Sequence, residues 1–244
     1  MPALSRPFRR RCRLAALTAA LTAAAATPFA QNAGAARSSW MSHHFEDVLT
    51  LHDAVVRGDL RAARTMAGHI ATEADPPRLS GAGRARVSRI RAMASDVAAA
   101  ETIRTAADAT AGMVSTCGDC HAAAGTRMPP PPAAPSSEVG GLVGHMVAHR
   151  TALESLLAGL VIPSASEWAN GARQLEGATL PPHSLPKDPK LTAAVAGADA
   201  RVHQLAAAAS AATSQDARVA VYGQLLATCA SCHSLHPTVW GPTR

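Results

Sequence analysis

Aromatic residues are scarce in this chain of 244 residues: phenylalanine, tryptophan and tyrosine together make up 3%. A core of this size is therefore short of bulky side chains, unless something other than protein completes it. Charged residues are also few, at 16%, which excludes the highly charged composition of disordered proteins. Glycine and proline, with 17 residues each, are near average usage and exclude a collagen-like or low-complexity chain.

The formal charge of +6 is concentrated at one end of the chain. Residues 1–30 hold no acidic residue and five arginines: Arg6, Arg9, Arg10, Arg11 and Arg13. The remainder has 18 basic and 17 acidic residues, so it is close to neutral. A near-neutral protein gives no electrostatic basis for binding nucleic acid, and we expect no nucleic-acid partner.

The basic N-terminal segment leads into an apolar run from Leu14 to Ala26. This order is typical of a secretory signal peptide, and the run is shorter than the ~20 residues of a membrane span. We expect cleavage after Ala30 or Ala35, so that residues 1–35, including Cys12, are removed. The sequence therefore predicts an exported, periplasmic protein that does not contact the membrane once the signal is gone.

The four remaining cysteines lie in two identical Cys-x-x-Cys-His motifs. These are Cys117, Cys120 and His121, and Cys229, Cys232 and His233. Between them, residues 128–137 contain four consecutive prolines, which cannot be helical and favour an extended spacer. The sequence thus predicts two domains, 38–127 and 138–244, on either side of a proline-rich linker.

The two halves also resemble each other outside the motifs. A shift of 112 residues superposes the motifs and about thirty residues before them without gaps. A shift of 101 residues aligns the starts, pairing His44 with His145 and Gly58 with Gly159. A duplication explains both agreements, and we expect each half to fold by itself.

The apolar periodicity predicts four helices in each half and no strand. The expected ranges are 42–57, 59–73, 82–99 and 101–121, then 138–161, 164–177, 188–211 and 214–233. Short connections between helices indicate antiparallel neighbours. The predicted fold is therefore all-α, with two tandem four-helix bundles of up-down-up-down topology.

Cys-x-x-Cys-His is the signature of covalent haem attachment. Two thiols on one helical turn can each add to a vinyl group, and the adjacent histidine can bind the iron. A thioredoxin-type redox pair would need a βαβ context, and zinc would need a compact set of further ligands, which the sequence does not show. A structural disulfide would not require the histidine twice. We therefore predict two covalently attached haem c groups.

The motif near the end of a fourth helix resembles the class II c-type cytochromes, of the cytochrome c-prime type. The resemblance covers roughly residues 40–125 and 138–240. It implies that the four thiols attach two haems and that the motif histidines are the proximal iron ligands. The residues concerned are Cys117, Cys120 and His121 for one haem, and Cys229, Cys232 and His233 for the other.

The sixth iron ligand should come from the first helix of each half, because its start lies beside the end of the fourth helix. His44 shares an apolar helical stripe, whereas His43 falls on the polar side. His145 occupies the same stripe in the second half, and His52 lies ~12 Å further along its helix. We predict His44 and His145 as distal ligands. The alternatives are His149, His69, His183, Met41, Met146 or an open position.

Two six-coordinate haems would make the protein an electron carrier between redox partner proteins. An open distal position would instead allow binding of nitric oxide or carbon monoxide, as in cytochrome c-prime. No acid–base constellation accompanies the motifs, so we do not expect an enzyme. The sequence leaves homodimer formation open.

Overall fold

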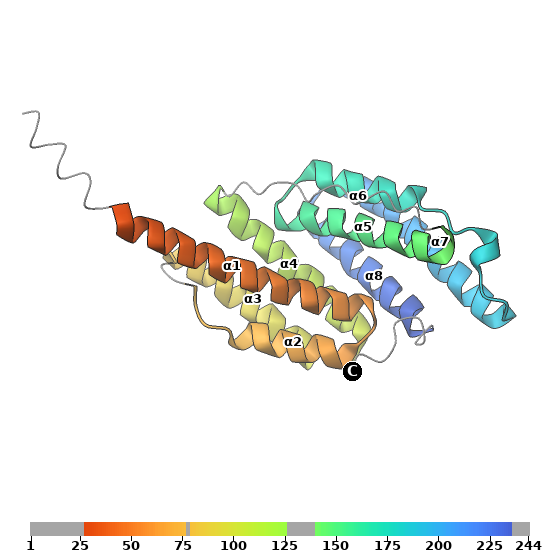
Figure 1. Ribbon diagram of the computed structural model, residues 1–244, viewed down its shortest axis with the longest axis horizontal. Coiled ribbons are helices and arrows are strands. Elements are labelled where there is room, and N and C mark those ends of the chain that lie inside the picture. Colours follow the sequence, from red (N-terminus) through yellow and green to blue (C-terminus); the bar gives the residue numbers. More distant parts are fainter. Residues whose placement is uncertain (1–26, 77–78, 126–139, 236–244) are drawn as a thin grey trace, which may run out of the picture.

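The computed structural model describes residues 27–76, 79–125 and 140–235 (Figure 1). Within these residues the chain forms eight α-helices and one short 3-10 helix, η1 (Pro182–Ser184), without any strand. The all-α prediction is confirmed. The α-helices are α1 (Thr27–Val56), α2 (Leu60–Thr72), α3 (Gly81–Ala99), α4 (Ile103–Ala124), α5 (Gly141–Val161), α6 (Ala165–Gly177), α7 (Pro189–Ala211) and α8 (Gln215–Ser234). The apolar run that ends at Ala26 and the linker 128–137 lie outside the described residues.

Side-chain caps fix where most of these helices begin. The Asp59 carboxylate accepts the N–H of Ala62 at the start of α2. Thr102 forms a reciprocal capping box with Thr105 at the start of α4, which marks a break that is weak in the sequence. α1 begins at Thr27 and not at the expected residue 42. Both candidate cleavage positions fall within this extension.

Helices that follow each other in the chain pack together within each half, and α4 and α8 join the halves. These two helices run antiparallel: Gln215 at the start of α8 donates to Ser115 near the end of α4, and Gly223 lies against Asp108. α4 also packs on α5, and α8 packs on α1 (Figure 1). The first and last helices of one half thus contact the last and first helices of the other.

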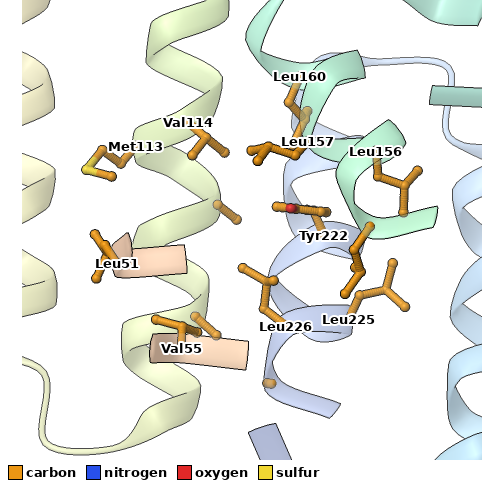
Figure 2. Close-up of a cluster of buried hydrophobic side chains, with 14 of the residues drawn as sticks. Leu51, Val55, Met113, Val114, Leu156, Leu157, Leu160, Tyr222, Leu225 and Leu226 are labelled. Atoms are coloured by element: carbon orange, nitrogen blue, oxygen red, sulfur yellow. The ribbon is translucent and has the colours of Figure 1, made fainter. Parts of the chain in front are cut away.

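One cluster of buried apolar residues extends through both halves. Figure 2 shows its centre, where side chains from α1, α4, α5 and α8 meet. Its labelled members are Leu51, Val55, Met113, Val114, Leu156, Leu157, Leu160, Tyr222, Leu225 and Leu226. A core shared in this way weighs against the expectation that each half folds by itself.

Corresponding residues of the two halves are related by two different shifts in residue number. α2 and α6 have equal lengths and lie 105 residues apart, from their caps Asp59 and Ser164 onward. α4 and α8 begin after Thr102 and Ser214, 112 residues apart, as the sequence predicted. The shift of 101 predicted for the first helices is therefore wrong by four residues, about one helical turn. One turn leaves the buried face unchanged, so periodicity alone does not reveal the error.

Candidate functional site

The two Cys-x-x-Cys-His motifs occupy the last turns of α4 and α8. Their first thiols, at Cys117 and Cys229, pack against the apolar core, and all four motif cysteines are free. Burial raises the pKa of Cys117 to about 12 and that of Cys229 to about 12. A thiol–disulfide exchange site needs the opposite shift, because its thiol must ionise readily. The thioredoxin-type reading is thus disfavoured by burial as well as by the absence of strands in the described residues.

Both motif histidines are oriented by a backbone carbonyl. The Nδ1–H of His121 donates to the carbonyl oxygen of Val161 at 2.8 Å. The Nδ1–H of His233 donates to the carbonyl oxygen of Val56 at 2.7 Å. Since a carbonyl only accepts, Nδ1 of each ring carries a proton, and Nε2 is the nitrogen through which the neutral form would bind a metal. Metal-binding histidines are typically held in this way.

Both of these hydrogen bonds cross from one half to the other. Val161 ends α5, and Val56 ends α1. The close approach depends on small residues: a Cβ on Gly118 would lie 2.1 Å from the carbonyl oxygen of Leu160. A Cβ on Gly58 would lie 2.9 Å from the carbonyl oxygen of Ala230. Each motif turn is therefore docked against the end of the other half's first helix.

His44 lies on α1 with 6% of its surface exposed. Its ring stacks on Trp40, with centroids 4.7 Å apart and planes 11° from parallel. Its Nδ1–H donates to Glu73 at 2.6 Å, and its Nε2 is buried without a hydrogen-bond partner. His43 is exposed and donates to the carbonyl of Ser39, so the predicted orientations of His43 and His44 are confirmed.

Contacts along α8 show which end of α1 faces the first motif. The end of α1 meets the end of α8, where Gly58 lies against Ala230. The start of α8 meets the end of α4, where Gln215 contacts Ser115. The end of α1 and the first motif therefore lie toward opposite ends of α8. His44, twelve residues before the end of α1, is therefore displaced along the helix toward the first motif.

In the second half, the side chains of two histidines on α5 lie close to an aspartate on α7. His145 and His149 are 6% and 8% exposed, with ring centroids 4.1 Å apart. The Nε2 of His145 lies 3.0 Å from Asp199, and that of His149 lies 4.0 Å from the same oxygen. His203, one turn after Asp199 on α7, lies 3.7 Å from its other oxygen. We call these four residues the His–Asp cluster.

The His–Asp cluster neighbours the second motif. Burial, together with the charges of His145, His203 and His233, lowers the pKa of His149 to about 3. Burial also raises the pKa of Cys232, with a smaller contribution from Asp199. Asp199 was not predicted from the sequence. Its one signal is the i,i+4 spacing to His203 on an alanine-rich helix.

The structural register changes which residues of the two halves correspond. A shift of 105 residues pairs His44 with His149 and Trp40 with His145. In both pairs a ring four residues earlier on the same helix packs on the histidine. The Nε2 atoms of His44 and His149 are both buried without a hydrogen-bond partner. The equivalence of His44 with His145 is thus replaced by equivalence with His149.

The His–Asp cluster also supplies the compact donor set that the sequence did not show. Donor atoms of His145, His149 and Asp199 lie within 4.8 Å of one another, a set that suits a divalent metal ion. The first half has Trp40 and Val87 where the second has His145 and Asp199. Among the described residues, only the second half therefore carries this cluster. A function common to both motifs has to depend on the residues that both halves share.

The other predicted alternatives lie elsewhere or are less buried. His69 is exposed and pairs with Asp47 at 3.1 Å, and His183 is exposed in η1. His52 is buried, and its Nε2 lies 2.7 Å from the hydroxyl of Tyr222 in the shared core. Met41 and Met146 are half-buried.

No protein-family model, curated protein or solved structure matches this chain significantly. None of the helices in the described part of the chain has the length and apolarity needed to cross a membrane.

Proposed function

We propose that this protein is an exported c-type cytochrome with two covalently attached haems, which carries electrons between redox partner proteins. One observation carries the proposal. Two Cys-x-x-Cys-His turns each present a histidine whose Nδ1–H is held by a carbonyl and whose Nε2 would bind a metal in the neutral form. The arrangement occurs in both halves, although their other polar residues differ. This agreement supports the same function for both motifs.

Haem bound at the motifs would supply a one-electron couple at its iron. The four motif thiols would hold the two groups by thioether bonds, and His121 and His233 would be the proximal ligands. The residues fit this role because the thiols of Cys117 and Cys229 pack against the apolar core and the histidines are already oriented. The covalent groups would also provide the bulk that a chain so poor in aromatic residues lacks.

We propose His44 as the distal ligand of the first iron. It is buried, fixed on one face by Trp40 and at Nδ1 by Glu73, and its Nε2 has no hydrogen-bond partner. A buried polar nitrogen without a partner is costly unless a ligand completes it. Two imidazoles that stay on the iron in both oxidation states suit a carrier, because little rearrangement accompanies each electron.

For the second iron, the structural register favours His149 over His145. His149 corresponds to His44, and its unpartnered nitrogen is Nε2, as in His44, whereas that of His145 is Nδ1. The Nε2 of His145 already lies 3.0 Å from Asp199. His145 stays the prediction from the sequence, and variants of the two histidines distinguish them.

The test is haem stoichiometry and ligation in the purified full chain. Intact mass and a pyridine haemochrome assay should show two covalent haems per chain. Cys120→Ser should lose most of one haem, and Cys232→Ser should lose most of the other. A protein without covalent haem refutes the proposal. Rapid stoichiometric binding of carbon monoxide at both ferrous haems would replace electron transfer by gas binding.

A further inference from the structure

We propose that Glu73 is a positioning residue for His44, and that its carboxylate lowers the reduction potential of the first iron. This inference rests on the proposed function, since it concerns the ligand set of one of the two haems. Glu73 lies outside both motifs and would act on the iron only through His44.

The contact between Glu73 and His44 is short and shielded from water. Oε2 of Glu73 accepts the Nδ1–H of His44 at 2.6 Å, and the two side chains are 16% and 8% exposed. A hydrogen bond to a carboxylate is stronger than one between neutral groups. Because the carboxylate only accepts, it fixes the proton on Nδ1 and leaves the lone pair on the buried Nε2.

Glu73 is itself held in place from two sides. It is the C-terminal cap residue of α2, and its carbonyl oxygen accepts a hydrogen bond from the Arg91 guanidinium of α3. The same guanidinium pairs with Asp75 at 2.7 Å. Trp40, which stacks on His44, donates to the carbonyl of Ala74 at 3.2 Å. Residues of α1, α2 and α3 thus fix the imidazole before any ligand arrives.

A carboxylate hydrogen-bonded to a ligand imidazole makes that imidazole more basic. A more basic ligand stabilises ferric iron relative to ferrous iron, so the reduction potential falls. In the second half the cap residue that corresponds to Glu73 is Ala178, which has no carboxylate. The second haem is therefore an internal reference, because a change at Glu73 should leave it unaffected.

The experiment is a redox titration of the haem-loaded full-length Glu73→Gln protein. Glutamine keeps the acceptor oxygen and the side-chain length but removes the charge. We expect the first potential to rise by about 59 mV, the shift that corresponds to a tenfold change for one electron. The second potential should not move. His44→Ala identifies which of the two waves belongs to the first haem.

Asp47→Asn is the matched control, because Asp47 lies three residues from His44 on α1 and pairs with His69 instead. It should leave both potentials unchanged. Should Glu73→Gln fail to accumulate, Glu73→Asp replaces it, and the shorter side chain should also raise the first potential. Two low-spin haems with potentials unmoved by both Glu73 variants overturn this inference alone, as does an equal shift from Asp47→Asn. Absence of covalent haem overturns the proposed function instead.

Discussion

Each half of the chain holds one buried histidine in place, and the two halves do so with different side chains. In the first half, Trp40 and Glu73 hold His44 from α1 and from the end of α2. In the second half, His145 packs on His149, and the nearest carboxylate, Asp199, comes from α7. The histidine is kept, while the residues that surround it have changed.

Some features accompany both motifs, whereas others occur in one half only. Features present twice are the motif turn, its carbonyl-bound histidine and a buried histidine four residues after another ring. Features present once, such as the Glu73 contact and the His–Asp cluster, belong to one half. They are where the two halves should differ in chemistry.

The largest effect is expected when the two halves are separated. Residues 38–127 and 137–244, each exported on its own, should fail to give soluble haem proteins. Each would expose the faces of α4 or α8 that the other now covers, and each motif histidine would lose its carbonyl partner. Expression yield and haem staining check this. Two well-folded single-haem fragments would show that the shared core is dispensable.

Within the intact chain, the largest effect is expected from Gly118→Ala. The new methyl group would meet the carbonyl oxygen of Leu160, which is backbone and cannot easily move aside, so we expect a loss of about 3 kcal/mol. Thermal unfolding and haem content of the first motif provide the measurement.

Two further variants, Gly68→Ala and Ala230→Gly, serve as controls for Gly118→Ala. Gly68→Ala, on α2 with open space around it, should stabilise the helix by ~0.5–1 kcal/mol. Ala230→Gly, at the corresponding position of the second motif, should cost about 2 kcal/mol, because it removes a buried methyl group and lowers helix propensity. Equal stability of Gly118→Ala and Gly68→Ala would contradict the close docking of α4 on α5.

The helices were largely predictable because their signals are local. Caps such as Asp59 and Ser214 and the apolar periodicity place most boundaries within a few residues. The pairing of the two halves was not predictable in this way. The bond from His121 to Val161 depends on how α4 packs on α5, and no local pattern records it. The histidine register failed because a slip of one turn preserves the buried face.

A pH effect is also expected in the first half, from a buried histidine that is not a proposed iron ligand. The pKa of His52 is lowered to about 4, mainly by burial; the charge of Asp53 opposes this shift and that of Arg150 adds to it. Below its unfolded value of 6.5, the unfolded chain binds a proton that the folded chain rejects. Stability should therefore fall as the pH drops from about 6.5 to about 4, by ~3 kcal/mol in total.

A double variant isolates this contribution. In the second half the position that corresponds to His52 is Leu157, which is buried. His52→Leu combined with Tyr222→Phe removes both partners of the buried hydrogen bond together, so neither is left unsatisfied. Chemical denaturation at pH 7 and at pH 4.5 should show a smaller loss of stability than in the unaltered protein. An unchanged pH dependence would mean that His52 is not the group responsible.

The smallest change in stability, and the most direct comparison of the halves, comes from His149 and His145. Haem-loaded His149→Ala should turn one haem high-spin and let its ferrous form bind carbon monoxide, as His44→Ala should do for the other. His145→Ala should keep both haems low-spin, because His145 corresponds to Trp40, which packs on a ligand without being one. Absorption and electron paramagnetic resonance spectra report each spin state separately. If His145→Ala gives the high-spin haem and His149→Ala does not, the second iron uses a ligand one turn nearer the start of its helix. The two distal sites would then differ in register although both motif turns dock in the same way.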